Sequence, residues 1–285
     1  MIRRASYLIV IMALTSALHA QQTAVTAPRE HDIYCAGIVT TTPPPSGSYV
    51  VSGVESGTRI TFSRGDLVYI NRGSAQGTQV GSEFLVSRRV KDPLAQSWFV
   101  WQDSLMKAMG STYADIGRIR VVHVETNTST AEIEQFCQQM YRGDIITPFV
   151  ARPAPSYRPA AKLDIFAPPT GKEMAMVVAT RDFGQTAYVG EVVYVNLGSG
   201  QGVKVGDYYR VFRFQGDRHA TAYQTRGQDH SVSGFGTAPG IWKWMDLPRE
   251  IVGEGMVLSV SPNASTVLIT NSLREIYAGD YVEIE

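Results

Sequence analysis

One pattern of residues occurs twice in this chain, and this duplication restricts the possible folds more than any other feature. Residues 65–88 recur as residues 190–213 at a constant offset of 125, with 12 identities in 24 positions and no gap. Residues 117–144 recur as residues 253–280 at an offset of 136, so the connection between the two stretches is 11 residues longer in the second copy. Loops tolerate such differences because the entropy of loop closure grows slowly with length. The chain is therefore expected to contain two copies of one folding unit.

The shared residues are typical of short strands and tight turns. Residues 67–70 and 192–195 are runs of β-branched and aromatic residues, which predict strands that are buried on both sides or that close a barrel. In each copy Asn-x-Gly-Ser-x-Gln-Gly follows, and these residues tolerate positive φ. Later segments of each copy predict three further strands and a final turn. The recurring glycines are interpreted as a structural turn motif: Gly73, Gly77, Gly81, Gly198, Gly202 and Gly206.

The spacing of these strands predicts the fold class. Short strands separated by turn signals about 8 to 12 residues apart are typical of a small barrel or sandwich. We predict a mainly β fold with two tandem, homologous, small β-barrel-like domains at residues 48–148 and 163–285. Four prolines within 148–159 bias the intervening chain toward extended polyproline II. Residues 149–162 are therefore expected to form a semi-rigid, proline-rich linker.

The N-terminal residues have the features of a secretory signal peptide. Arg3 and Arg4 precede an almost uncharged apolar stretch of 12 residues at 7–18, and residues 18–20 form a small-residue cleavage site. This stretch is shorter than the about 20 residues that span a bilayer, and no later segment is long and apolar enough to replace it. We predict a signal peptide at 1–20, an N-terminal extended segment at 21–47, and a periplasmic or secreted protein with no transmembrane segment after cleavage. An uncleaved signal anchor is the alternative.

The chain has two cysteines, Cys35 and Cys137. Export would place them where a disulfide persists, and pairing would close a loop of about 100 residues. The alternative is two small buried thiol side chains, because the sequence does not give their separation.

The connections within the copies contain the tryptophans that we interpret as a candidate binding surface. Residues 94–109 predict a helix, with Trp98 and Trp101 on the same apolar stripe as Leu105 and Met109. We expect this stripe to cap an open end of the barrel; the alternative is a platform for a protein partner or a glycan. The second copy carries Trp242 and Trp244 in a loop, where alternate spacing places both indoles on one side of an extended chain.

Composition and motifs favour binding over catalysis. Lys plus Arg and Asp plus Glu number 26 each, so the chain has no overall attraction to nucleic acid or anionic lipid. The scattered histidines lack the paired spacing of a metal site, and neither copy contains a phosphate-binding loop or a nucleophile elbow. The aspartates of Gly143-Asp144 and Gly279-Asp280 are interpreted as turn residues rather than as acid/base groups. We predict no catalytic residue, no cofactor, no metal and no nucleic-acid partner.

The repeated pattern resembles a domain of bacterial envelope proteins. The likeness is carried by Gly-Asp-x-Val-Tyr-Ile-Asn-x-Gly from Gly65, by Gly-x-x-Val-Gly and a strand that ends at Arg88, and by residues 116–144. Over about 80 residues of each copy, this pattern is similar to the C-terminal domain of the flagellar assembly protein T, and more distantly to the barrels of the cell-shape scaffold protein MreC. Tyr49 to Gly53 faintly resembles the opening of a peptidoglycan-binding LysM domain. The resemblance implies a periplasmic, non-enzymatic role in assembly.

These expectations define two candidate functions. The first is a non-enzymatic, exported cell-envelope protein that acts as an interaction or assembly scaffold through its tandem β-domains. The alternative is a peptidoglycan-binding protein of LysM-like type, in which aromatic side chains stack on sugar rings. The expected partner is an envelope protein in the first case and peptidoglycan in the second, and the oligomeric state is left open.

Overall fold

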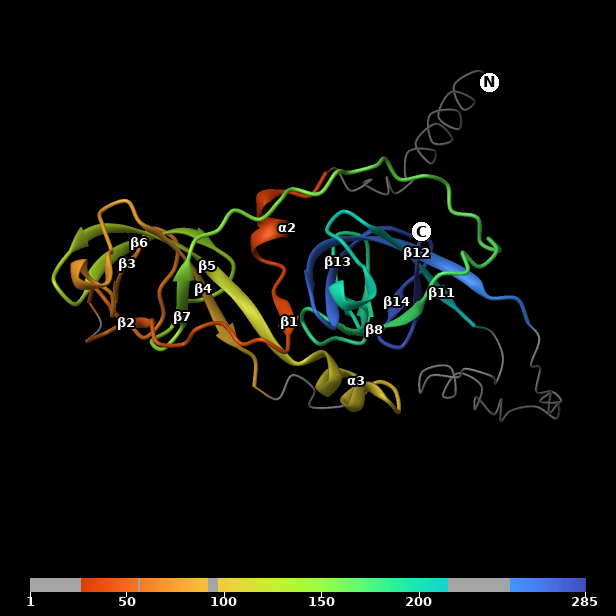
Figure 1. The fold of residues 1–285 in the computed structure, drawn as a ribbon, viewed down its shortest axis with the longest axis horizontal. Coiled ribbons are helices and arrows are strands. Elements are labelled where there is room, and N and C mark those ends of the chain that lie inside the picture. Colours follow the sequence, from red (N-terminus) through yellow and green to blue (C-terminus); the bar gives the residue numbers. More distant parts are fainter. Residues whose placement is uncertain (1–26, 56, 92–96, 215–246) are drawn as a thin grey trace, which may run out of the picture.

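The computed structural model describes residues 27–55, 57–91, 97–214 and 247–285. Its elements form two mainly β domains that lie next to one another along the long axis of the molecule (Figure 1). The prediction of a mainly β chain with two barrel-like domains is confirmed. Among the described residues, no helix has the length and apolar character needed to cross a bilayer.

The first domain is a curled antiparallel sheet. Its strand order is β2-β3-β6-β5-β4-β7, and β1 (Ile38–Thr40) pairs with β5 outside this path. The two edges meet, because Tyr49 and Ile145 form a bridge and the Val50 N–H donates to the Asp144 carbonyl at 2.9 Å. The strands on the path are β2 (Val50–Gly53), β3 (Leu67–Ile70), β4 (Glu83–Arg89), β5 (Ser111–Val124), β6 (Ser129–Phe136) and β7 (Ile145–Pro148).

The second domain is a closed barrel with the same arrangement. Its order is β8-β10-β13-β12-β11-β15, and each strand occupies the position of its counterpart in the first domain. A short pair, β9 (Thr186–Ala187) and β14 (Ile276–Tyr277), lies outside the barrel sheet. The shared order shows that the sequence duplication is a duplication of the fold. The barrel strands are β8 (Met174–Thr180), β10 (Val192–Val195), β11 (Tyr208–Arg213), β12 (Glu250–Ser261), β13 (Ala264–Ser272) and β15 (Tyr281–Ile284).

Inward-facing apolar residues of the strands fill the two domains. Strand alternation places every second side chain inside, so each domain has its own core. Central members of the first core are Val50, Phe62, Ile70, Ile119 and Ile133. Central members of the second core are Val177, Tyr209, Val211, Val257 and Ile269.

The recurring glycines perform two different structural tasks in the turn after β3 or β10. Gly73 has an extended backbone, and a Cβ there would collide with the backbone carbonyls of Glu125 and Thr126. Gly77 instead ends the short 3-10 helix Ser74–Gln76 at φ 78°, in the left-handed region that glycine favours. The second copy repeats both features, with a crowded Gly198 and with Gly202 at φ 85°. The motif therefore records close backbone approach as well as turn geometry.

This difference predicts different costs for substitution. Gly73→Ala is expected to lower the free energy of unfolding by about 1 to 3 kcal/mol, because the new methyl group overlaps backbone that the sheet holds in place. Gly77→Ala meets no atom within 4 Å, so only its positive φ is penalised, at about 1 kcal/mol. Urea unfolding of both variants measures the two costs. An equal or larger loss for Gly77→Ala would contradict the steric account of Gly73.

The chain outside the barrels differs in part from the expectation. The segment expected to be extended at 21–47 contains the short helix α2 (Glu30–Tyr34) and strand β1. The helix expected at 94–109 is observed as α3 (Gln102–Met109), and residues 92–96 lie outside the described part. The linker at 149–162 has neither helix nor strand, but it packs on the second domain. Its Arg158 N–H donates to the Tyr208 hydroxyl at 2.8 Å, and the Arg158 guanidinium pairs with Glu254 at 2.6 Å.

Candidate interaction surfaces

The N-terminal segment joins the two domains. Strand β1 pairs with β5 of the first domain and also contacts β12 and β13 of the second (Figure 1). The hydroxyl of Thr266 donates to the Gly37 carbonyl at 3.1 Å, and the hydroxyl of Ser261 donates to the Val39 carbonyl. The backbone of this segment is therefore hydrogen-bonded to both domains.

Tyr194 of β10 lies at the centre of this joint. Its side chain is 1% exposed, and its hydroxyl donates to the Ala36 carbonyl at 3.1 Å. Burial raises the pKa of the Tyr194 phenol, and the charge of Asp115 raises it further. A tyrosine hydroxyl is already protonated at neutral pH, and the raised pKa extends its role as a donor across the joint to more alkaline pH.

Helix α3 covers the outer face of the second barrel. The Gln102 side-chain amide donates to the Val178 carbonyl of β8 at 2.7 Å, and Met106 and Met109 pack in one cluster with Val178 and Tyr194. The expectation that this helix caps an open end of its own barrel is therefore wrong. The buried side of the helix is formed by Gln102, Met106 and Met109, which pack against the neighbouring domain, whereas Trp101 of the predicted stripe is exposed.

The four tryptophans of the candidate binding surface have different environments. Trp98 is half-buried, and its indole N–H donates to the Phe183 carbonyl of the second domain at 3.3 Å. Trp101 is 68% exposed at the start of α3. Trp242 and Trp244 lie outside the described residues. Trp98 thus contributes to the joint, and Trp101 is the tryptophan that the described surface offers to a partner.

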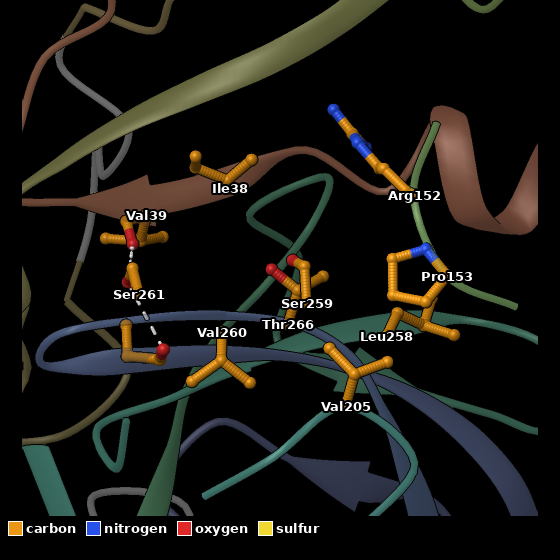
Figure 2. Close-up of a pocket in the computed structure, with 11 residues that line it drawn as sticks. Ile38, Val39, Arg152, Pro153, Val205, Leu258, Ser259, Val260, Ser261 and Thr266 are labelled. Atoms are coloured by element: carbon orange, nitrogen blue, oxygen red, sulfur yellow. Dashed lines mark hydrogen bonds between the residues drawn. The ribbon is translucent and has the colours of Figure 1, made fainter. Parts of the chain in front are cut away.

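A pocket of about 240 Å³ lies in the joint between β1 and the β12–β13 hairpin. Figure 2 shows Ile38 and Val39 on one side of it, facing Leu258 and Val260 on the other. The hydroxyls of Ser261 and Thr266, which also line it, already donate to the backbone of the N-terminal segment. The pocket is therefore interpreted as a packing seam between domains.

Asp115 and Arg152 anchor the start of the linker beside this pocket. The two carboxylate oxygens of Asp115 accept hydrogen bonds from the Arg152 guanidinium at 2.8 and 2.9 Å, and one of them also accepts from the Gly37 N–H at 2.8 Å. Arg152 donates further to the Ile33 carbonyl at 2.8 Å. One buried ion pair thus binds the linker, the N-terminal segment and β5 together. The disulfide between Cys35 and Cys137, with Cα atoms 5.4 Å apart, adds a covalent link between the same segment and the first domain.

Each domain contains the same ion pair between a strand arginine and a buried turn aspartate, for which the sequence predicted only the turn. In the second domain, Arg213 donates twice to Asp280, at 2.7 Å each, and its guanidinium lies 4.8 Å from the centre of the Tyr277 ring. In the first domain, Arg88 makes the same contacts with Asp144 and Tyr141. All three residue types recur in the repeat, so joint recurrence was the signal that could have identified the pair.

The outer surface of β2 and β3 is exposed in the first domain, whereas the equivalent surface of β8 and β10 is buried in the second. Tyr49, Val51, Leu67 and Tyr69, here named the β2–β3 face, are 41, 41, 37 and 39% exposed. Their side chains point outward because the alternate residues Val50, Val68 and Ile70 fill the core. The expectation of burial on both sides holds for Val192–Val195, where all four residues are buried, but β3 is buried only at alternate positions.

The described residues contain no cluster of three or more histidine, cysteine, aspartate or glutamate side chains that could hold a metal ion. His123 lies 3.0 Å from the Glu125 carboxylate in an exposed pair. The predicted absence of catalytic, cofactor and metal residues stays a prediction. Comparison of the chain with models of known protein families and with curated proteins found no match.

Proposed function

We propose that the chain is a non-enzymatic, exported cell-envelope protein that acts as an interaction or assembly scaffold. One observation carries the proposal: the chain uses the outer face of β8 and β10 for domain docking, and leaves the equivalent β2–β3 face exposed. Two tyrosines and two aliphatic residues on one sheet surface provide the broad apolar contact that protein interfaces use. Export is supported by the signal-peptide features of residues 1–20 and by the Cys35–Cys137 disulfide, a bond that persists in oxidising compartments.

Peptidoglycan binding is the second candidate. It is favoured by the exposed aromatic rings of Tyr49, Tyr69 and Trp101, which could stack on sugars. The likeness to a LysM opening is weakened, because residues 50–53 form β2 and the described residues between β2 and β3 form turns and a bridge, with no helix. The scaffold function is therefore the better-supported candidate.

Site-specific photo-crosslinking in the source cells tests the scaffold function. A benzophenone amino acid in place of Tyr69 is expected to capture a protein that mass spectrometry identifies as an envelope component. The same probe in place of Tyr188, which is 49% exposed between β9 and β10 of the second domain, is the matched control and is expected to capture none.

Sedimentation with isolated cell-wall sacculi tests the alternative. The purified protein is expected to remain in the supernatant. Pelleting of the wild type that Tyr69→Ala abolishes, together with no crosslinked protein at position 69, would replace the scaffold function with glycan binding.

A further inference from the structure

We propose that the β2–β3 face binds the second domain of another copy of this chain, so that copies associate head to tail. This inference rests on the proposed scaffold function and names its partner. Its basis is a contact of the same kind within the chain, where β1 and α3 cover the outer face of β8 and β10.

The two sheet faces correspond residue by residue. The Gly143 N–H donates to the Val50 carbonyl and the Gly279 N–H to the Val177 carbonyl, both at 2.8 Å, so β2 and β8 are in matching register. Val51 therefore corresponds to Val178, and the sequence repeat pairs Tyr69 with Tyr194. Val178 and Tyr194 are at most 1% exposed because β1 and α3 cover them, whereas their counterparts in the first domain are about two-fifths exposed.

The second domain exposes a surface that corresponds to the start of the covering segment, just before β1. The Ile251 N–H donates to the Ile165 carbonyl at 2.8 Å, which places residues 165–166 alongside β12. Ile251 corresponds to Asp115 in the repeat, and Asp115 is held by the N-terminal segment just before β1. In the first domain that segment, at Ala36, is buried against the second barrel. The corresponding stretch of the second domain, residues 165–166, is uncovered: Ile165 is 39%, Phe166 67% and the nearby Leu247 43% exposed.

The two uncovered surfaces lie on different domains, as a head-to-tail contact requires. Figure 1 shows β2 and β3 at the end of the molecule away from the second domain, and the linker crossing the second domain before β8 begins. A contact between two different surfaces is heterologous, and it produces open chains or closed rings of copies. An isologous dimer would instead use one surface twice.

The surface next to the β2–β3 face, on β6 and β5, predicts a reversible contact. Where the second domain has the fully buried Leu268 and Met256, the first domain has Glu132 and Arg120, both exposed. The Arg120 guanidinium pairs with Glu83 at 2.7 Å, so part of the surface is polar and stable in water. Such a surface is typical of partners that also exist apart, and we expect association that rises with concentration.

Sedimentation velocity over a range of concentrations tests the association with the purified protein. The weight-average sedimentation coefficient of the wild type is expected to rise with protein concentration. Tyr69→Glu and Phe166→Glu, which change the two proposed surfaces separately, are each expected to weaken association by about tenfold or more, as a change of 1.4 kcal/mol or more would. Tyr188→Glu, at an exposed tyrosine that belongs to neither surface, is the matched control and is expected to associate like the wild type. Leu67→Lys serves as a second face variant if Tyr69→Glu loses its cooperative melting transition.

Mixing the two variants tests the head-to-tail geometry. Tyr69→Glu retains the second-domain surface and Phe166→Glu retains the face, so an equimolar mixture is expected to form a 1:1 dimer and no larger species. A monomeric wild type, or association that Tyr69→Glu abolishes and Phe166→Glu leaves unchanged, would overturn the inference. If the wild type is monomeric but the probe at position 69 captures a different envelope protein, only the proposed self-association is wrong. If the wild type is monomeric and the probe captures no protein, the scaffold function is wrong as well.

Discussion

Reduction of the Cys35–Cys137 disulfide is expected to lower the free energy of unfolding by about 4 to 5 kcal/mol. The two cysteines are 102 residues apart in the sequence. In the chain-entropy model, a crosslink that closes a loop of this length stabilises the fold mainly by restricting the unfolded chain. Because domains are commonly stable by only about 5 to 15 kcal/mol, the loss would be a large fraction of the total.

The position of the bond adds a second consequence. Cys35 follows α2 in the segment that continues into β1, and Cys137 follows β6 of the first domain. The bond therefore anchors the segment whose carbonyls accept hydrogen bonds from Tyr194 and Thr266. Reduction is expected to weaken the joint between the domains as well as the first domain itself.

Guanidinium unfolding with and without a thiol reductant measures the effect. The Cys35→Ser/Cys137→Ser variant is the control, since it should unfold at the midpoint of the reduced wild type and should not respond to the reductant. Equal midpoints for oxidised and reduced wild type would show that the bond contributes no stability.

Local features of the fold could be predicted from the sequence. Strands 67–70 and 192–195 and the turns after them were recognisable because β-branched runs and glycines act over a few residues. The duplication adds one further prediction: both copies should have the same strand order, whatever that order is. Two barrel-like domains could be predicted from these short-range signals, but the strand order that they share could not.

The candidate surfaces could not be predicted in the same way. Val178 and Val51 are both outward-facing valines in matching strands, yet one is buried and the other is 41% exposed. The difference depends on where α3 and β1 pack, and this packing joins residues far apart in the sequence. A hydrophobic pattern shows that a face is apolar, but it does not show whether the same chain covers it.

Loss of the ion pair between Asp280 and Arg213 is the second change that we expect to lower stability strongly. Asp280→Ala is expected to lower the free energy of unfolding by about 3 to 5 kcal/mol, as is typical when one partner of a buried pair is removed. The Asp280 side chain is 2% exposed and accepts from Arg213 and from the Tyr277 N–H, at 2.8 Å for the latter. Its loss removes two charge-assisted hydrogen bonds from an arginine side chain that is only 11% exposed.

The first domain provides a matched comparison. Asp144→Ala removes the same contacts, but the Arg88 side chain is 33% exposed, so water can solvate the charge that remains. Asp144→Ala is therefore expected to destabilise less than Asp280→Ala. Hydrogen exchange of β11 and β15, compared with that of β4 and β7, assigns each loss to its own domain.

The pH dependence of the stability of Arg213→Met separates the contribution of the arginine charge from that of its packing. Burial raises the pKa of Asp280, and Arg213 opposes this rise, so removal of Arg213 raises the pKa further. A carboxyl that holds its proton more tightly when folded than when unfolded makes stability fall as pH rises between the two pKa values. The deficit of Arg213→Met is therefore expected to be largest near neutral pH and to shrink as pH approaches about 4, the ordinary pKa of an aspartate. Urea unfolding at a series of pH values measures this deficit. A deficit independent of pH would mean that the arginine contributes by packing on the Tyr277 ring rather than by its charge.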